Sequence, residues 1–114
     1  MKTKSDPFRQ QDEIQWEICG KGLRRQILGY GSGVMTVKVE FESGGDGGLH
    51  SHPHAQTGYI AAGKFSVMID GQTRILSAGD GFFVAPNVMH HVKCVEKGVA
   101  VDNFSPVRED FLGE

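Results

Sequence analysis

Apolar and polar residues alternate along most of the chain, a pattern typical of β-strands that bury one face. The clearest example spans residues 34–42. The buried face expected there consists of Met35, Val37, Val39 and Phe41. No segment shows a sustained helical period. About ten short strands with glycine-rich turns between them predict an all-β sandwich or barrel.

Two shorter patterns predict an early strand and a hairpin. Ile14, Trp16 and Ile18 alternate with other residues and predict a strand with one apolar face. Asp70-Gly71 predicts a two-residue hairpin turn, because a type I′ turn needs a positive φ at both central positions.

Glycine-containing segments are expected to end other strands. The tripeptides 61–63 and 96–98 are predicted to be turns, and residues 81–84 a short buried strand. The two turns would separate strand 57–60 from 64–70 and strand 90–95 from 99–105.

The length of 114 residues suits one domain. Residues 1–11 are polar and predict an N-terminal arm or edge strand. Residues 12–114 would then form the β-barrel domain, with one helical turn expected around 108–112.

Composition excludes some classes of partner and compartment. The net charge is −2 without a basic stripe, so we expect no nucleic-acid partner. No apolar run approaches the ~20 residues that span a bilayer, so we expect no membrane partner. The polar N-terminus carries no recognisable signal peptide, and we expect a cytoplasmic protein. Cys19 and Cys94 are then expected to be free thiols, not a disulfide.

Histidines supply the first candidate chemistry. His50, His52 and His54 occupy alternate positions, which lie on one face of an extended chain. His50 and His52 could therefore bind one metal ion, and Gln56 could add a carboxamide oxygen. A cluster of surface histidines without a metal is the alternative.

The last predicted strand supplies a second group of candidate functional residues. Ala100, Asp102 and Phe104 share one face, so Asp102 points inward if its neighbours do. An inward carboxylate needs a partner. Arg108 could pair with Asp102 as a structural ion pair, or could bind a substrate carboxylate. The residues alone leave both interpretations open.

Two spaced motifs resemble those of the cupin family. They are Gly44-x5-His50-x-His52-x3-Gln56-x6-Gly63 and Gly79-x5-Ala85-x-Asn87-x2-His90-x3-Cys94. Asn87 replaces the usual glycine, and asparagine tolerates the positive φ expected there. Gln56 replaces the usual glutamate.

The resemblance implies a jelly-roll β-barrel that holds one divalent ion. Its ligands would be His50, His52, Gln56 and His90. Without thiolate ligands the ion could be Ni, Zn, Mn or Fe(II). His54 is then expected at the pocket rim or on the surface, and not as a ligand. His91 should face away from the site, since adjacent strand residues point to opposite faces, and should have a structural role.

Further segments narrow the resemblance to the pectin-degradation cupins of the KdgF type. They are His-Ser-His-Pro-His-x-Gln, Ala-Gly-Asp, Pro-Asn-Val-x-His and Asp-x-Phe-Ser-Pro-x-Arg-Glu-Asp-Phe. The resemblance to that group implies that a glutamine is the fourth ligand. It also implies an enzyme that converts 4,5-unsaturated monouronates, which are small anionic sugar acids, to linear keto acids. The catalytic residues implied here are Asp102, Phe104 and Arg108. Small cupins also commonly form dimers, so we expect a homodimer.

Two other functions fit a mononuclear cupin. One is an iron or nickel dioxygenase of small molecules, which oxygen consumption would reveal. The other is a non-catalytic protein that binds a sugar acid without turnover.

Overall fold

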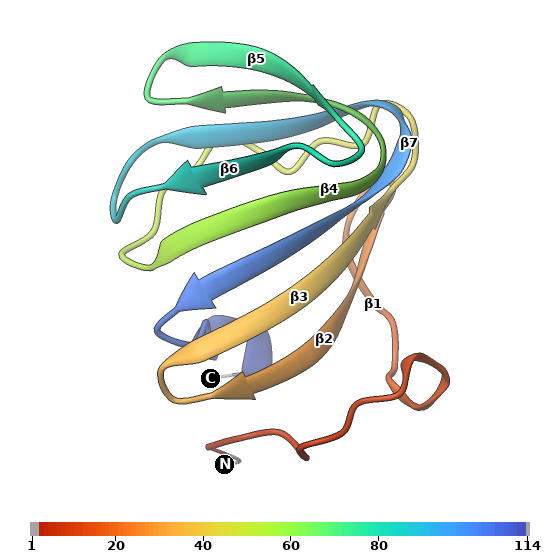
Figure 1. Cartoon of the computed structure of the whole chain (residues 1–114), viewed down its shortest axis with the longest axis vertical. Coiled ribbons are helices and arrows are strands. Elements are labelled where there is room, and N and C mark those ends of the chain that lie inside the picture. The colour runs from red at the N-terminus through yellow and green to blue at the C-terminus, as the bar shows by residue number, and fades with distance from the viewer. Residues whose placement is uncertain (1–2, 114) are drawn as a thin grey trace.

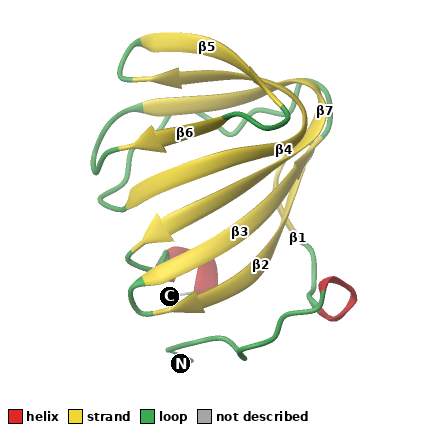
Figure 2. Cartoon of the chain, in the orientation of Figure 1, coloured by secondary structure: helices red, strands yellow, loops and turns green. Residues whose placement is uncertain are grey.

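The computed structural model describes residues 3–113; residues 1, 2 and 114 of the predicted arm and tail lie outside the described part. The elements are the 3-10 helix η1 (Gln11–Glu13), strands β1 (Glu17–Gly20), β2 (Leu23–Gly31), β3 (Val34–Phe41), β4 (Ala55–Ile69), β5 (Gln72–Ser77), β6 (Gly81–Val84) and β7 (His90–Ser105), and the 3-10 helix η2 (Glu109–Leu112). Figure 2 shows how little of the chain is helical. No helix in this part of the chain is long and apolar enough to cross a membrane.

The strands form one antiparallel sheet in the order β1-β2-β3-β7-β4-β5, with β6 paired to β4. The sheet curls over on itself because β4 and β7 are long and strongly bent (Figure 1). The first part of β4 pairs with β6 and its last part with β5, so β4 runs through both halves of the curled sheet. This architecture confirms the all-β jelly-roll prediction.

The bends in β4 and β7 correct the predicted turns at 61–63 and 96–98. Both tripeptides lie inside continuous strands, where the pairing of β4 with β7 shifts register. Gly63 has a φ of +85°, and a Cβ there would lie 2.4 Å from the Lys97 carbonyl oxygen. A Cβ on Gly98 would lie 2.2 Å from the carbonyl oxygen of Ala62. The glycines therefore let two backbones pass closely at a corner.

The core lies on the concave side of the sheet. Met35, Val37, Val39 and Phe41 are all buried, as the alternation predicts. The prediction for 81–84 holds only in part, because β6 lies at an edge and leaves Phe83 60% exposed.

The predicted apolar face of the first strand is wrong. Ile14 is buried but precedes β1, whereas Ile18 is 82% exposed. Cys19 packs against the core instead. The face changes because Ile14 caps the helical turn η1 and β1 begins only at Glu17, so no continuous strand joins the two isoleucines.

The local turn predictions agree with the structure. Asp70 and Gly71 have φ values of 51° and 81° and join β4 to β5. Asn87 has a φ of 66°, so it takes the left-handed conformation expected of it. The tail forms the short helix η2, and both Cys19 and Cys94 are free.

The N-terminal segment lies along β2. Arg9 donates hydrogen bonds to the carbonyls of Ile27 and Leu28. Gln26, fully buried, donates from its amide nitrogen to the carbonyls of Gln11 and Ile14. These bonds hold the segment against the outer side of β2.

Candidate metal centre and active site

Three histidines from two separate segments converge at one end of the curled sheet. His50 and His90 form an isolated antiparallel bridge, with N···O distances of 3.1 and 2.9 Å. His52 follows in the same loop as His50 and is buried. One ligand atom from each of the three rings lies within 4.8 Å of the other two. This spacing suits three imidazoles around one cation.

Each of these rings is oriented by a backbone carbonyl. Nδ1 of His50 lies 2.9 Å from the Gly48 oxygen. Nδ1 of His52 lies 3.0 Å from the His54 oxygen, and Nδ1 of His90 lies 2.9 Å from the Val88 oxygen. A carbonyl can only accept, so each Nδ1 carries the proton and each Nε2 presents a lone pair. Metal-binding histidines are held in this way.

The neutral form of two of these rings is also favoured. Burial lowers the pKa of His52 and of His90, and the positive charge of Arg108 lowers both further. A neutral imidazole is the form that binds metal.

The donor set fits a metal ion. Nε2 of His90 is buried and has no hydrogen-bond partner in the described part of the chain. Oε1 of Gln56 lies 3.0 Å from Nε2 of His52, so a fourth donor reaches the same point. An unpaired buried nitrogen costs free energy, which a bound cation would offset.

Asp102 lies beside this centre on β7, opposite Val37 of β3 and Gly58 of β4. Burial raises the pKa of Asp102 to about 6, although the hydrogen bond from Gln56 and the charge of Arg108 lower it. Since the carboxylate accepts from the Gln56 nitrogen, the Gln56 oxygen faces the histidines. One amide thus joins the predicted metal ligands to the acidic residue.

Arg108 does not form the structural ion pair with Asp102 that the sequence left open. Within the described residues its ion pair is with Asp110, whose carboxylate accepts from Nε at 3.1 Å and from Nη2 at 2.8 Å. The guanidinium carbon lies 5.1 Å from the Phe104 ring centroid and 4.2 Å from that of Phe111.

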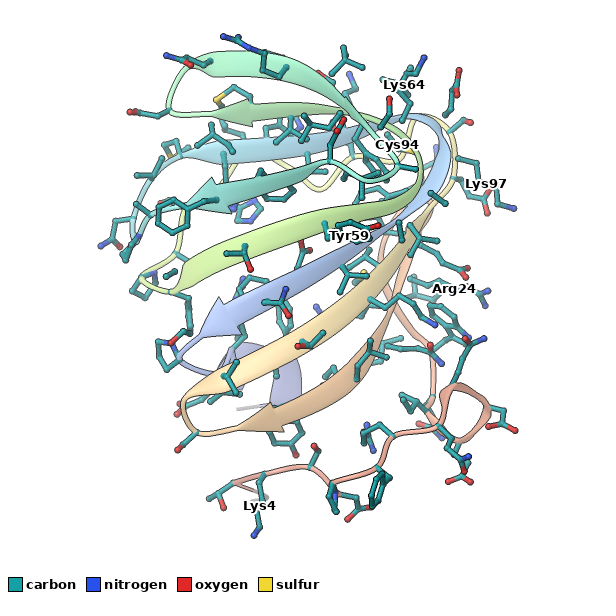
Figure 3. The ribbon with its side chains drawn as sticks, viewed as in Figure 1. Lys4, Arg24, Tyr59, Lys64, Cys94 and Lys97 are labelled. Atoms are coloured by element: carbon teal, nitrogen blue, oxygen red, sulfur yellow. The ribbon has the colours of Figure 1, made fainter. Side chains whose placement is uncertain are left out.

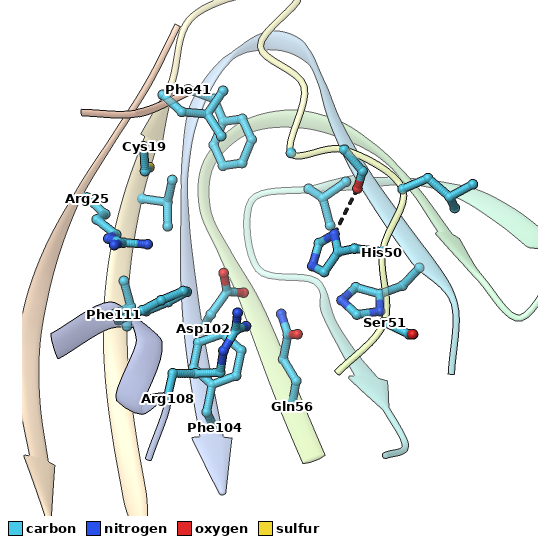
Figure 4. Close-up of a pocket in the computed structure, with 18 residues that line it drawn as sticks. Cys19, Arg25, Phe41, His50, Ser51, Gln56, Asp102, Phe104, Arg108 and Phe111 are labelled. Carbon is cyan, nitrogen blue, oxygen red and sulfur yellow. Dashed lines mark hydrogen bonds between the residues drawn. The ribbon is translucent and has the colours of Figure 1, made fainter. Parts of the chain in front are cut away.

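Most of these side chains, with the exceptions of His52 and Asp110, line one cavity of about 500 Å³ (Figure 4). The sequence-predicted residues that line it are His50, Gln56, His90, Asp102, Phe104 and Arg108. Leu23, Val37, Val39 and Phe41 provide apolar walls. The cavity therefore combines imidazoles, one carboxyl group and two guanidinium groups.

The other two histidines lie apart from the lining of this cavity. The His54 ring packs on that of His52, with centroids 5.5 Å apart. His91 Nε2 contacts the carboxylate of Asp46, so His91 points away from His90 as expected. The roles of His50, His52, Gln56 and His90 as metal ligands remain predictions.

Sequence reasoning missed Arg25, Cys19 and Phe111 as lining residues. Arg25 could have been found, because it alternates with Leu23 and Ile27 on the inward face of β2. A charged residue in an apolar face is a signal for pairing or binding. Phe111 carries no such signal, since η2 alone brings it to the cavity.

Comparisons with known proteins agree with this architecture. A cupin domain model matches residues 37–101. The chain is 45% identical over 103 residues to the pectin degradation protein KdgF of Dickeya dadantii, covering 89% of this chain and 94% of that protein.

Two solved structures are also similar over nearly the whole chain. An RmlC-like cupin from Shewanella frigidimarina superposes with a TM-score of 0.94 at 42% identity, over 96% of this chain and 99% of that one. KdgF from a Halomonas species gives a TM-score of 0.88 at 36% identity, over 91% and 98%. The chain therefore belongs to the cupin family, in the group that includes the KdgF pectin-degradation proteins.

Proposed function

We propose that this protein is a metal-dependent enzyme that opens the ring of 4,5-unsaturated monouronates to give the linear keto acid. One observation carries the proposal: a carboxyl group, Asp102, lines the same cavity as two guanidinium groups and as His50 and His90 of the convergent histidine triad. The similarity to a pectin degradation protein supports the choice of an acidic sugar.

The reaction is an isomerisation that moves one proton. Loss of the proton from the anomeric hydroxyl forms the C1 carbonyl and breaks the bond between C1 and the ring oxygen. The ring oxygen becomes an enolate on C5, conjugated with the carboxylate. Protonation of C4 then leaves a ketone at C5. No oxidant, reductant or water is consumed.

Asp102 is the proposed proton carrier. A carboxyl with a pKa near 6 is mostly ionised at neutral pH and can take the anomeric proton. The same carboxyl, once protonated, can deliver a proton to C4. The Gln56 amide holds Asp102 in place, and Phe104 would pack on the sugar face and orient it.

His50, His52, His90 and Gln56 would hold the divalent ion. When bound there, the ion supplies Lewis-acid stabilisation of the negative charge that develops on the ring oxygen. Arg108 adds positive charge on another side of the cavity and would attract the substrate carboxylate.

The test is direct. Purified protein loaded with Ni²⁺, Zn²⁺, Mn²⁺ or Fe²⁺ is mixed with unsaturated galacturonate, and loss of the conjugated C=C absorbance is followed. We expect turnover with at least one metal and none after chelation. Oxygen consumption with Fe²⁺ would instead indicate a dioxygenase, and uronate binding without turnover would indicate a binding protein.

A further inference from the structure

Arg25 is a second cation inside the cavity, on the strand β2 that none of the predicted site residues occupies. Its side chain is only 19% exposed. Two contacts hold it: Nε donates to Glu17 at 3.3 Å, and the guanidinium carbon lies 3.9 Å from the Phe111 ring centroid. These two contacts fix the side chain and leave its two terminal nitrogens without a hydrogen bond.

The far end of Arg25 has no partner among the described residues. Only Nε forms a hydrogen bond there. Neither terminal nitrogen is a buried atom without a hydrogen-bond partner, so both nitrogens are accessible to solvent. A mostly buried guanidinium normally pairs with an anion, and Glu17 provides one for Nε only. Here the two terminal nitrogens border a cavity, so an anion from solution can reach them.

Arg108 is more fully ion-paired than Arg25. Asp110 occupies Nε and Nη2 of Arg108, which are one of its two-nitrogen edges. Both guanidinium groups lie against Phe111, at 3.9 Å for Arg25 and 4.2 Å for Arg108. In the close-up, Phe111 lies between them (Figure 4). Glu17 contacts Arg25 through Nε alone at 3.3 Å, so the charge of Arg25 is less fully paired than that of Arg108, and its terminal nitrogens are free to bind a carboxylate.

We propose that Arg25 binds the substrate carboxylate through its two terminal nitrogens and so selects acidic over neutral sugars. The inference rests on the proposed uronate activity and adds a residue to it. In this arrangement the carboxylate end of the sugar faces β2 and η2, and the reacting oxygens face the histidines and Asp102. Arg25 is a substrate-positioning residue whose loss weakens binding more than chemistry.

The test compares Arg25→Gln and Arg25→Met with Arg25→Lys in the metal-loaded, full-length protein. Arg24→Gln is the matched control, because the Arg24 guanidinium pairs with Glu40 at 2.7 Å and stacks on Trp16 at 3.9 Å, outside the cavity lining. Figure 3 shows Arg24 projecting outward from the sheet. The readouts are KM and kcat for unsaturated galacturonate, and calorimetric binding of galacturonate and of galactose.

We expect Arg25→Gln and Arg25→Met to raise KM by about 10- to 100-fold with kcat changed less than about threefold. Galacturonate binding should fall equally, and galactose binding should stay unchanged. Arg25→Lys should recover part of the loss, and Arg24→Gln should match the wild type. Melting temperature and metal content verify that each variant is folded and loaded.

Three results would overturn the inference. One is an unchanged KM in Arg25→Gln and Arg25→Met. The second is an equal loss of affinity for galacturonate and galactose, which would indicate a structural role. The third is a wild-type protein that neither converts the unsaturated sugar nor binds galacturonate, which would refute the proposed function itself.

Discussion

In each ring of the histidine triad Nδ1 is hydrogen-bonded to a backbone carbonyl, which leaves the lone pair of Nε2 available to a metal ion. The carbonyl partners lie only two residues away in the chain, so the local backbone selects the ring tautomer of His50, His52 and His90. The motif spacing predicted that these residues would meet. It did not reveal the carbonyl partners, since every residue carries a carbonyl and only the folded loop selects three of them.

Replacement of His90 by alanine should abolish stable metal binding. The affinity should fall by more than about 100-fold, beyond the 10- to 100-fold typical of losing an outer hydrogen-bond partner. His91→Ala is the matched control, because the neighbouring ring contacts Asp46 instead of the centre. Metal content after equilibration at limiting Zn²⁺ measures both. Equal retention by the two variants would contradict the predicted ligand set.

Asp102→Asn should abolish ring opening, with a loss in kcat of about 10²- to 10⁴-fold, because asparagine cannot carry the proton. Its shape still fits beside Gln56, so metal content should remain at the wild-type level. Stopped-flow absorbance on metal-loaded protein gives the rate. Turnover near that of the wild type would remove Asp102 from the mechanism.

At the scale of elements, the corner between β4 and β7 shapes the cavity. Alternation predicted strands on both sides of 61–63 and 96–98 but not their continuity. A glycine that ends a strand and one that lets a remote backbone approach look the same in sequence. The position of η2 was equally hidden, because it depends on Phe111 meeting Phe104, 5.7 Å away between ring centroids.

Gly63→Ala should therefore destabilise the fold by about 2–4 kcal/mol, through the positive φ and the clash with backbone oxygens of β7. Gly31→Ala is the control, since nothing lies within 4 Å of a Cβ there. Its effect should be within about 0.5 kcal/mol. Urea unfolding of the two variants gives the comparison. Equal midpoints would show that the corner tolerates a side chain.

At the scale of the whole molecule, the predicted ligands come from a loop and from the starts of two strands, β4 and β7. The two cupin motifs predicted that these residues lie close together, because the motifs are tied to one known fold. A local pattern of apolar and polar residues carries no such information. The homodimer stays a prediction, which light scattering after size exclusion can test.

A bound ion would tie these segments together and should stabilise the native state. At a free metal concentration of 100 Kd the gain is about 2.7 kcal/mol, if the unfolded chain does not bind the ion. Thermal unfolding with and without chelator should show a higher Tm for the loaded protein. In His90→Ala the two curves should coincide. A metal-dependent shift of wild-type size in that variant would place the ion elsewhere.

The neutral amide at Gln56 has a consequence for both halves of the site. The glutamate usual in the cupin motif would hold a cation more tightly, yet it would set a second negative charge against Asp102 and remove its hydrogen-bond donor. Gln56→Glu should thus increase metal affinity while lowering kcat, as calorimetry and kinetics on one preparation would reveal. If metal affinity and kcat both rose in this variant, Gln56 would not have these two opposing effects. A neutral amide at this position would therefore bind the ion less tightly than a carboxylate, and would keep a second negative charge away from Asp102.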